Sequence, residues 1–200
     1  MKNLLTFMLY LCFAGSLFSA DKHALIIAVG EYSKETGWSK ISSANDIPLI
    51  QDALTHQGFS GKNIKLVQDA AATREGILNA LEQLLSSVKN GDIVVIHYSG
   101  HGQQIMDDNG DEADGLDEAL VPYDANAYYV KDVYWGQNHI RDDELEVIIA
   151  KFRAKLGKNG QLLINLDSCH SGSATRGGKA RGGVGPLVSE NWNANDFAQS

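Results

Sequence analysis

The stretch IVVIHYSGHG, residues 93–102, decides the fold. Its first four residues form an uninterrupted apolar run, which is typical of a strand buried on both faces of a parallel sheet. The same pattern occurs in ALIIAV (residues 24–29) and LLINL (residues 162–166), and a shorter form occurs in IKLV (residues 64–67). The sequence therefore predicts four buried strands.

Amphipathic helices are predicted between these strands. One is expected over residues 45–56, with Pro48 in its first turn, where a missing N–H costs little. A second follows Thr73, a suitable N-cap, and a third opens at Asp142 or Asp143. Strands that alternate with helices indicate an α/β fold with three layers and a mostly parallel central sheet. In such sheets, functional sites form at the carboxyl ends of the strands.

The first 20 residues have the features of a secretory signal peptide: a basic Lys2, an apolar stretch over residues 4–18 and small residues at Ser19 and Ala20. We expect one compact domain over residues 21–172 and a glycine-rich loop with a C-terminal segment over residues 173–200. The mature protein is expected to be secreted or periplasmic, and no later stretch is long enough to span a bilayer.

The charge of the chain limits the classes of partner. The formal net charge of −8 becomes −9 when Lys2 leaves with the signal. This balance argues against nucleic acid or an anionic membrane as the main partner. Cationic substrates and metal ions remain compatible with it.

Cys169 is the only cysteine that remains after the signal, because the other is Cys12. It has no partner for a disulfide, so it is either an inert buried thiol or a nucleophile. His101 and Cys169 each follow a predicted buried strand, and they meet above one edge of the sheet if those strands are parallel neighbours. An imidazole beside a thiol can take its proton and activate it. The backbone amides of Gly102 and Cys169 are the predicted oxyanion donors.

With these two residues in place, the chain resembles the caspase-like cysteine peptidases, and specifically a bacterial metacaspase. The resemblance rests on an ordered set of motifs: HYSGHG at 97–102, DSCHSG at 167–172, Asn45-Asp46, Ala72-Thr73-Arg74, Gly91-Asp92 and the acidic segment 114–118. It implies a caspase-like α/β/α sandwich and a cysteine-type endopeptidase with His101 as base and Cys169 as nucleophile. It also implies protein or peptide substrates that are cut after arginine or lysine.

The family's carboxylates in the specificity pocket correspond to Asp46 and Asp167 here. Two carboxylates can hold a guanidinium through charge-assisted, bidentate hydrogen bonds. The spacing alone permits a simpler interpretation, in which Asp46 caps a helix and Asp167 only ends a strand.

The densest run of charge in the chain is the segment 107–118, which we call the acidic loop. Such a run is usually a solvated loop, and it lacks the spacing of an EF-hand. The resemblance nevertheless implies calcium, held by aspartates that correspond to Asp117, Asp142 and Asp143. A fourth family aspartate falls on Arg176, which leaves that site incomplete or completed by another residue. The remaining histidines show no zinc-ligand spacing.

The region after Cys169 leaves several alternatives open. A caspase-type sheet normally has two further strands, and no sequence for either is evident, so we expect the last strands to be missing or supplied by a second subunit. The alternative to an enzyme is a non-catalytic, caspase-like interaction module that binds calcium or a protein partner. The basic residues of the glycine-rich loop are either self-cleavage sites or part of an ordinary linker: Arg176, Lys179 and Arg181.

Overall fold

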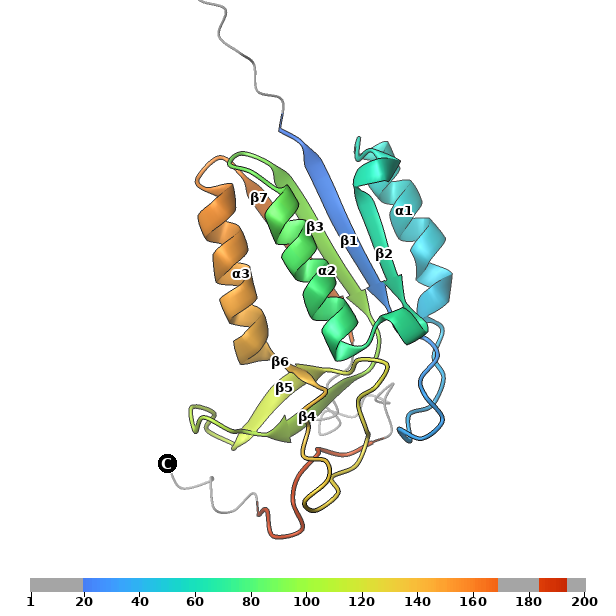
Figure 1. Cartoon of the computed structure of the whole chain (residues 1–200), viewed down its shortest axis with the longest axis vertical. Coiled ribbons are helices and arrows are strands. Elements are labelled where there is room, and N and C mark those ends of the chain that lie inside the picture. The colour runs from blue at the N-terminus through green and yellow to red at the C-terminus, as the bar shows by residue number, and fades with distance from the viewer. Residues whose placement is uncertain (1–19, 169–183, 194–200) are drawn as a thin grey trace, which may run out of the picture.

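The computed structural model describes residues 20–168 and 184–193. Four parallel strands form the main sheet in the order β2-β1-β3-β7, with bounds β1 Lys22–Ala28, β2 Ile64–Gln68, β3 Ile93–Ser99 and β7 Gln161–Asp167. The predicted α/β fold with a mostly parallel central sheet is confirmed (Figure 1).

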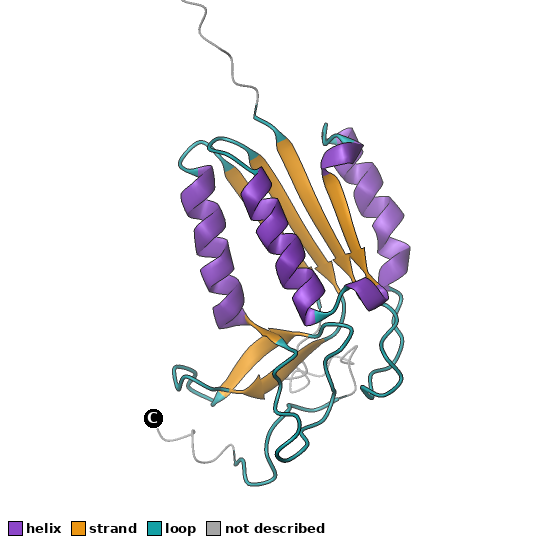
Figure 2. Ribbon diagram, in the orientation of Figure 1, coloured by secondary structure: helices purple, strands orange, loops and turns teal. Residues whose placement is uncertain are grey.

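Three long helices cover the sheet on two sides: α1 Asp46–His56, α2 Arg74–Ser87 and α3 Asp142–Leu156. Figure 2 shows α2 and α3 side by side on one face, and α1 lies against the other face. Thr73 caps α2 as predicted, since its Oγ1 accepts the N–H of Gly76 at 3.0 Å. Among the helices of the described residues, none is long and apolar enough to cross a membrane.

The core lies mainly between the sheet and the pair α2 and α3. Leu25, Ile27, Ile96 and Phe152 are among its buried members. The guanidinium of Arg74, at the start of α2, pairs with both carboxylate oxygens of Glu144 on α3 at 2.8 Å. This pair ties the N-terminal ends of two helices that share one face of the sheet.

A second, three-stranded antiparallel sheet lies beyond the carboxyl ends of the main strands, at the bottom of Figure 1. It contains β4 Gly102–Met106, β5 Leu116–Leu120 and β6 Ile140–Arg141. The sequence did not predict these strands, because polar residues occupy their buried positions: Gln103, Gln104 and Asp117.

Strand β7 is the last strand of the main sheet in the described part of the chain. Its Leu163 is 60% exposed and Leu166 is 40% exposed, and neighbouring strand residues alternate between the two faces. On the face that carries α1, a groove of about 790 Å³ runs beside Leu54, Val95 and Leu163. Within the described residues, the edge of β7 and the face that carries Leu163 are therefore open to contact, whereas Leu162 and Ile164 on the other face pack against the main core.

Candidate active site

A cavity of about 490 Å³ lies at the carboxyl edge of the main sheet. Three of the residues predicted for the site line it together: Asp46, His101 and Asp167. They come from the start of α1, the turn after β3 and the end of β7. The parallel register of β3 and β7, which sets Ser99 opposite Asp167, brings two of them to the same edge.

The turn between β3 and β4 carries His101 and is fixed by two tyrosines. The hydroxyl of Tyr98 lies 2.8 and 2.9 Å from the carbonyls of His101 and Val121, which share its single proton, and it accepts the Val121 N–H at 3.1 Å. The hydroxyl of Tyr32 accepts the backbone N–H of His101 at 2.8 Å. Gly100 precedes His101, and a Cβ on it would come within 2.5 Å of the Tyr98 hydroxyl. Only glycine fits at that close approach.

The imidazole of His101 has a defined orientation. Its Nε2 lies 2.9 Å from the backbone carbonyl of Ser39. A carbonyl can only accept, so Nε2 carries the proton and the lone pair of the neutral ring is on Nδ1. Burial lowers the pKa of His101, while the bond to Ser39 acts in the opposite direction. The ring is therefore set up as a neutral base with Nδ1 as its accepting atom.

Asp46 is the first residue of α1, and no side chain caps that helix. Its Oδ2 instead accepts a long hydrogen bond from the Ser99 hydroxyl at 3.4 Å, and its carboxylate faces the cavity. The simpler interpretation of Asp46 as a capping side chain therefore receives no support from the geometry. A carboxylate at a helix N-terminus is also favoured by the helix dipole.

Asp167 is exposed at the end of β7, and its backbone carbonyl accepts the N–H of Gly100 at 3.3 Å. Gly102 begins β4 directly after His101. Cys169 and Arg176 lie outside the described residues. The nucleophile and oxyanion roles therefore stay predictions. The described residues of the site are His101, Asp46 and Asp167.

Three residues contact His101 in a way that the sequence did not predict: Tyr32, Trp38 and Ser39. All lie in the segment between β1 and α1. The Trp38 ring stacks on the imidazole, with centroids 4.8 Å apart and planes at 27°. The only signal in the sequence was the presence of two aromatic residues in a loop after a buried strand. Nothing in their spacing indicated which side chain they would meet.

The acidic loop is exposed over residues 108–114, and its one buried acid is Asp117. Asp117 lies on β5 and is only 1% exposed, and burial raises its pKa to about 6. Among the described residues, its Oδ1 has no hydrogen-bond partner, while its Oδ2 contacts the guanidinium of Arg141. Arg141 also donates to the Met106 carbonyl at 2.8 Å and pairs with Asp108 at 3.0 Å. The guanidinium of Arg141, on β6, therefore already supplies positive charge to the acidic loop.

The three aspartates that the resemblance assigned to calcium do not form one group in the described residues. Within the described ranges, Asp117 groups with Asp107 and Asp111, each offering a ligand atom within 4.8 Å of the others. Asp142 and Asp143 begin α3 and do not belong to that group; Asp143 accepts a hydrogen bond from Asn109 at 2.7 Å. The unpartnered oxygen of Asp117 fits a hard cation, which prefers oxygen ligands.

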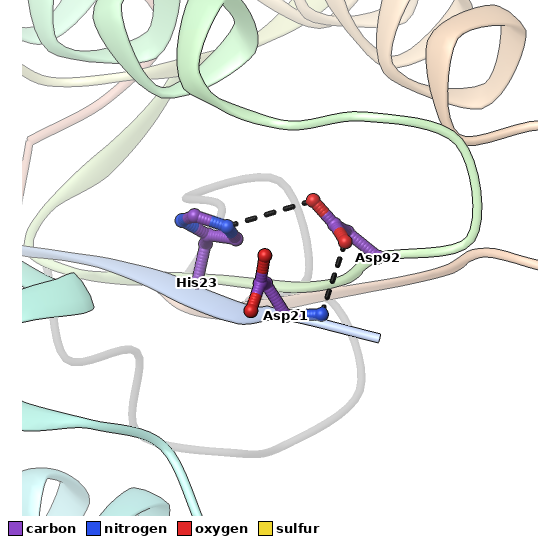
Figure 3. Close-up of side chains that lie close together, drawn as sticks. All are labelled: Asp21, His23 and Asp92. Carbon is purple, nitrogen blue, oxygen red and sulfur yellow. Dashed lines mark hydrogen bonds and ion pairs between the residues drawn. The ribbon is translucent and has the colours of Figure 1, made fainter. Parts of the chain in front are cut away.

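The other group of possible metal ligands in the described residues contains Asp21, His23 and Asp92 (Figure 3). It lies at the amino ends of β1 and β3, away from the cavity. Both oxygens of Asp92 are engaged: Oδ1 by the Asp21 N–H at 3.0 Å, and Oδ2 by the Lys89 N–H at 3.0 Å and His23 at 3.6 Å. These contacts give Asp92 a structural role, that of joining the starts of two strands.

Comparison with known proteins supplies the identity of the family. Residues 22–176 match the model of the metacaspase, peptidase C14 domain. The chain belongs to the metacaspase family. Metacaspase-1 of Mycosarcoma maydis is 30% identical over 165 residues, which cover 80% of this chain and 38% of that protein. Metacaspase-1 of Candida albicans is 34% identical over 166 residues, which cover 78% of this chain and 34% of that protein.

A crystal structure of a protein from Geobacter sulfurreducens is also similar, with a TM-score of 0.60 and 26% identity over 78% of this chain and 53% of that one. This metacaspase chain thus spans well under half the length of the curated relatives named above. The matched region includes every element that lines the cavity, from β1 to β7. The caspase-like arrangement predicted from the motifs agrees with this similarity.

Proposed function

We propose that the chain is a cysteine endopeptidase that cleaves proteins or peptides after arginine or lysine. The observation that carries this proposal is the cavity that joins one buried, oriented imidazole to two carboxylates. The carboxylates of Asp46 and Asp167 would hold the guanidinium or ammonium group of the substrate, and His101 would serve as the base. Membership of the metacaspase family supports the class of reaction.

The proposed chemistry starts with transfer of the Cys169 thiol proton to Nδ1 of His101. The thiolate attacks the carbonyl carbon of the scissile bond, and the amides of Gly102 and Cys169 stabilise the oxyanion. The imidazolium then protonates the leaving amine, which departs as the thioester forms. Water hydrolyses the thioester with His101 again acting as base, and the thiol is restored.

Calcium is the proposed cofactor, held at the acidic loop by Asp117, with Asp142 and Asp143 as the further ligands that the resemblance implies. A bound calcium ion would supply positive charge to a cluster of carboxylates and order the backbone that carries them. In the present arrangement, Arg141 already contacts Asp117, so the ion would have to compete with that guanidinium.

A second subunit is the proposed partner, and the open edge of β7 is the feature that supports it. Exposed strand edges pair readily with another strand, and β7 carries no lysine or proline to prevent this. A partner strand there would also cover Leu163 and the groove beside it. The same feature favours the second candidate function, a non-catalytic interaction module.

We further propose that the protein is exported, because residues 1–20 have the features of a signal peptide.

The decisive experiment is labelling of the purified chain by an arginine-directed electrophile that traps active-site thiols, with and without millimolar calcium. We expect label on Cys169, lost in Cys169→Ala and in His101→Ala. His56→Ala is the matched control, because His56 is exposed on α1 and should leave labelling unchanged. A folded chain that binds a protein partner but takes no label under either condition would favour the interaction module.

A further inference from the structure

The aromatic ring of Trp38 lies against the imidazole that the proposed function uses as its base. The two rings are stacked, and the ring of Tyr32 approaches the same imidazole at 5.0 Å with a tilt of 40°. Trp38 is only 9% exposed, although it belongs to a loop. Its Nε1 donates to the carbonyl of Ala125 at 3.0 Å, which fixes the orientation of the indole ring.

The backbone around Trp38 is held as firmly as its side chain. The carbonyl of Thr36 accepts the N–H of Ala127 at 2.8 Å. Gly37 has a φ of +83°, and a Cβ there would come within 2.9 Å of the Tyr128 ring. The turn before Trp38 thus requires glycine. Ser39, the next residue, provides the carbonyl that accepts Nε2 of His101. Two consecutive residues therefore contact the imidazole, one through a ring face and one through a carbonyl.

The charge that His101 acquires during the reaction needs stabilisation at this buried position. Among the described residues, no carboxylate makes a hydrogen bond to the imidazole: its ring bond goes to Ser39. The charged side chains that share the cavity are Lys40, Asp46 and Asp167. The hydroxyls of Tyr32 and Tyr98 engage the backbone of His101 and not its ring. An aromatic face attracts a cation, most strongly when that face is tryptophan and the pair is shielded from water.

We propose that Trp38 is a positioning residue of the peptidase site: its indole face holds the His101 imidazole against the Ser39 carbonyl and stabilises the imidazolium. The catalytic role of Trp38 rests on the proposed function, whereas the contact between the two rings is observed independently of it. Trp38 acts through His101 and has no role of its own in bond making.

The test is a histidine titration of the full chain by NMR, in a Cys169→Ala background, with the His101 signal assigned by its loss in His101→Gln. Trp38→Leu keeps an apolar side chain and removes the ring face. We expect it to lower the pKa of His101 by about 0.5–1 unit. Trp38→Phe keeps a weaker ring face and should lower that pKa by less. Trp135→Leu is the matched control, since Trp135 is 53% exposed, and it should leave the pKa unchanged.

A His101 pKa that stays the same or rises in Trp38→Leu overturns the proposal. If that variant does not fold, an unchanged pKa in Trp38→Phe overturns it instead. When Cys169 is present, Trp38→Leu should also move the pH midpoint of thiol alkylation upward. The imidazolium of His101 is then less stable, so less of it is present to stabilise the thiolate. The peptidase proposal fails separately: a chain that never cleaves basic substrates can still show the NMR shift.

Discussion

Acid should unfold this protein partly through His139, which directly precedes β6 and bonds to Gln103 on β4. His139 is 2% exposed. Its Nδ1 lies 3.0 Å from the Tyr134 hydroxyl, and its Nε2 lies 2.9 Å from Oε1 of Gln103. The amide nitrogen of Gln103 donates to the carbonyls of Ala127 and Gly185 at 2.9 and 2.8 Å. Oε1 of Gln103 is therefore an acceptor, so Nε2 of His139 carries a proton; the ring is neutral at pH 7 because burial lowers its pKa.

The size of the effect follows from the pKa of this group. Burial lowers the pKa of His139 from 6.5 to about 3, and the nearby charge of Arg141 adds to the shift. The unfolded chain binds a proton below pH 6.5 that the folded chain refuses until about pH 3. Stability from this group is complete above pH 6.5 and is lost as the pH falls toward 3. Between pH 7.5 and pH 5.0 the loss is about 2 kcal/mol.

The assay is urea unfolding at both pH values for the wild-type chain and for His139→Gln. Glutamine has no titratable group, so the wild-type chain should lose about 2 kcal/mol more than the variant between the two conditions. His56→Gln makes the same substitution at an exposed position and should lose as much as the wild-type chain. Equal losses for the wild-type chain and His139→Gln would refute the reasoning.

Three further predictions concern the turn, the acidic loop and the specificity pocket. Tyr98→Phe removes a fully buried hydroxyl with three backbone contacts, so urea titration should show a loss of about 1–3 kcal/mol, against under about 0.5 for the exposed Tyr128→Phe. Arg141→Met removes the competing guanidinium and should strengthen calcium binding about tenfold by calorimetry, whereas Arg153→Met, at an exposed position on α3, should change it little. Unchanged affinity in both variants would contradict the competition. Asp46→Asn should lower kcat/KM for arginine peptides by about 10–100-fold, and an equal loss with uncharged substrates would show that the carboxylate is not a specificity group.

The main sheet could be predicted because its strands are buried on both faces and its helices carry clear amphipathic patterns. The second sheet could not, because polar residues occupy buried positions in it and have their partners far away in the sequence. Gln103 is the plainest example: it lies on a strand, is fully buried and bonds to residues 127, 139 and 185. Hydropathy marks such a residue as exposed. Only the fold shows where its partners are.

Some features of the candidate site could likewise be predicted from the sequence, and others could not. His101 could be placed at the carboxyl edge of the sheet from the sequence, because it follows a buried parallel strand. Asp46 and Asp167 were assigned to the same site by the family resemblance. The contacts of Trp38 and Ser39 with His101 could not be predicted, because they depend on the path by which the loop after β1 returns. That path is set by contacts such as Ile41 N–H to the Gly30 carbonyl at 2.9 Å, which no periodicity encodes.

The imidazole of His101, the proposed base, is positioned by segments that all precede β7. The carboxylate of Asp69 accepts the N–H groups of Gly30 and Glu31, both at 2.9 Å, and thereby fixes the start of the loop that carries Trp38 and Ser39. Asp69 itself has a φ of +45°, a strained conformation for a residue other than glycine. The strain is sustained because its carboxylate satisfies two backbone donors at once. An imidazole held by a ring, a carbonyl and this anchored loop needs little reorganisation before proton transfer, which is the condition under which a buried base is effective.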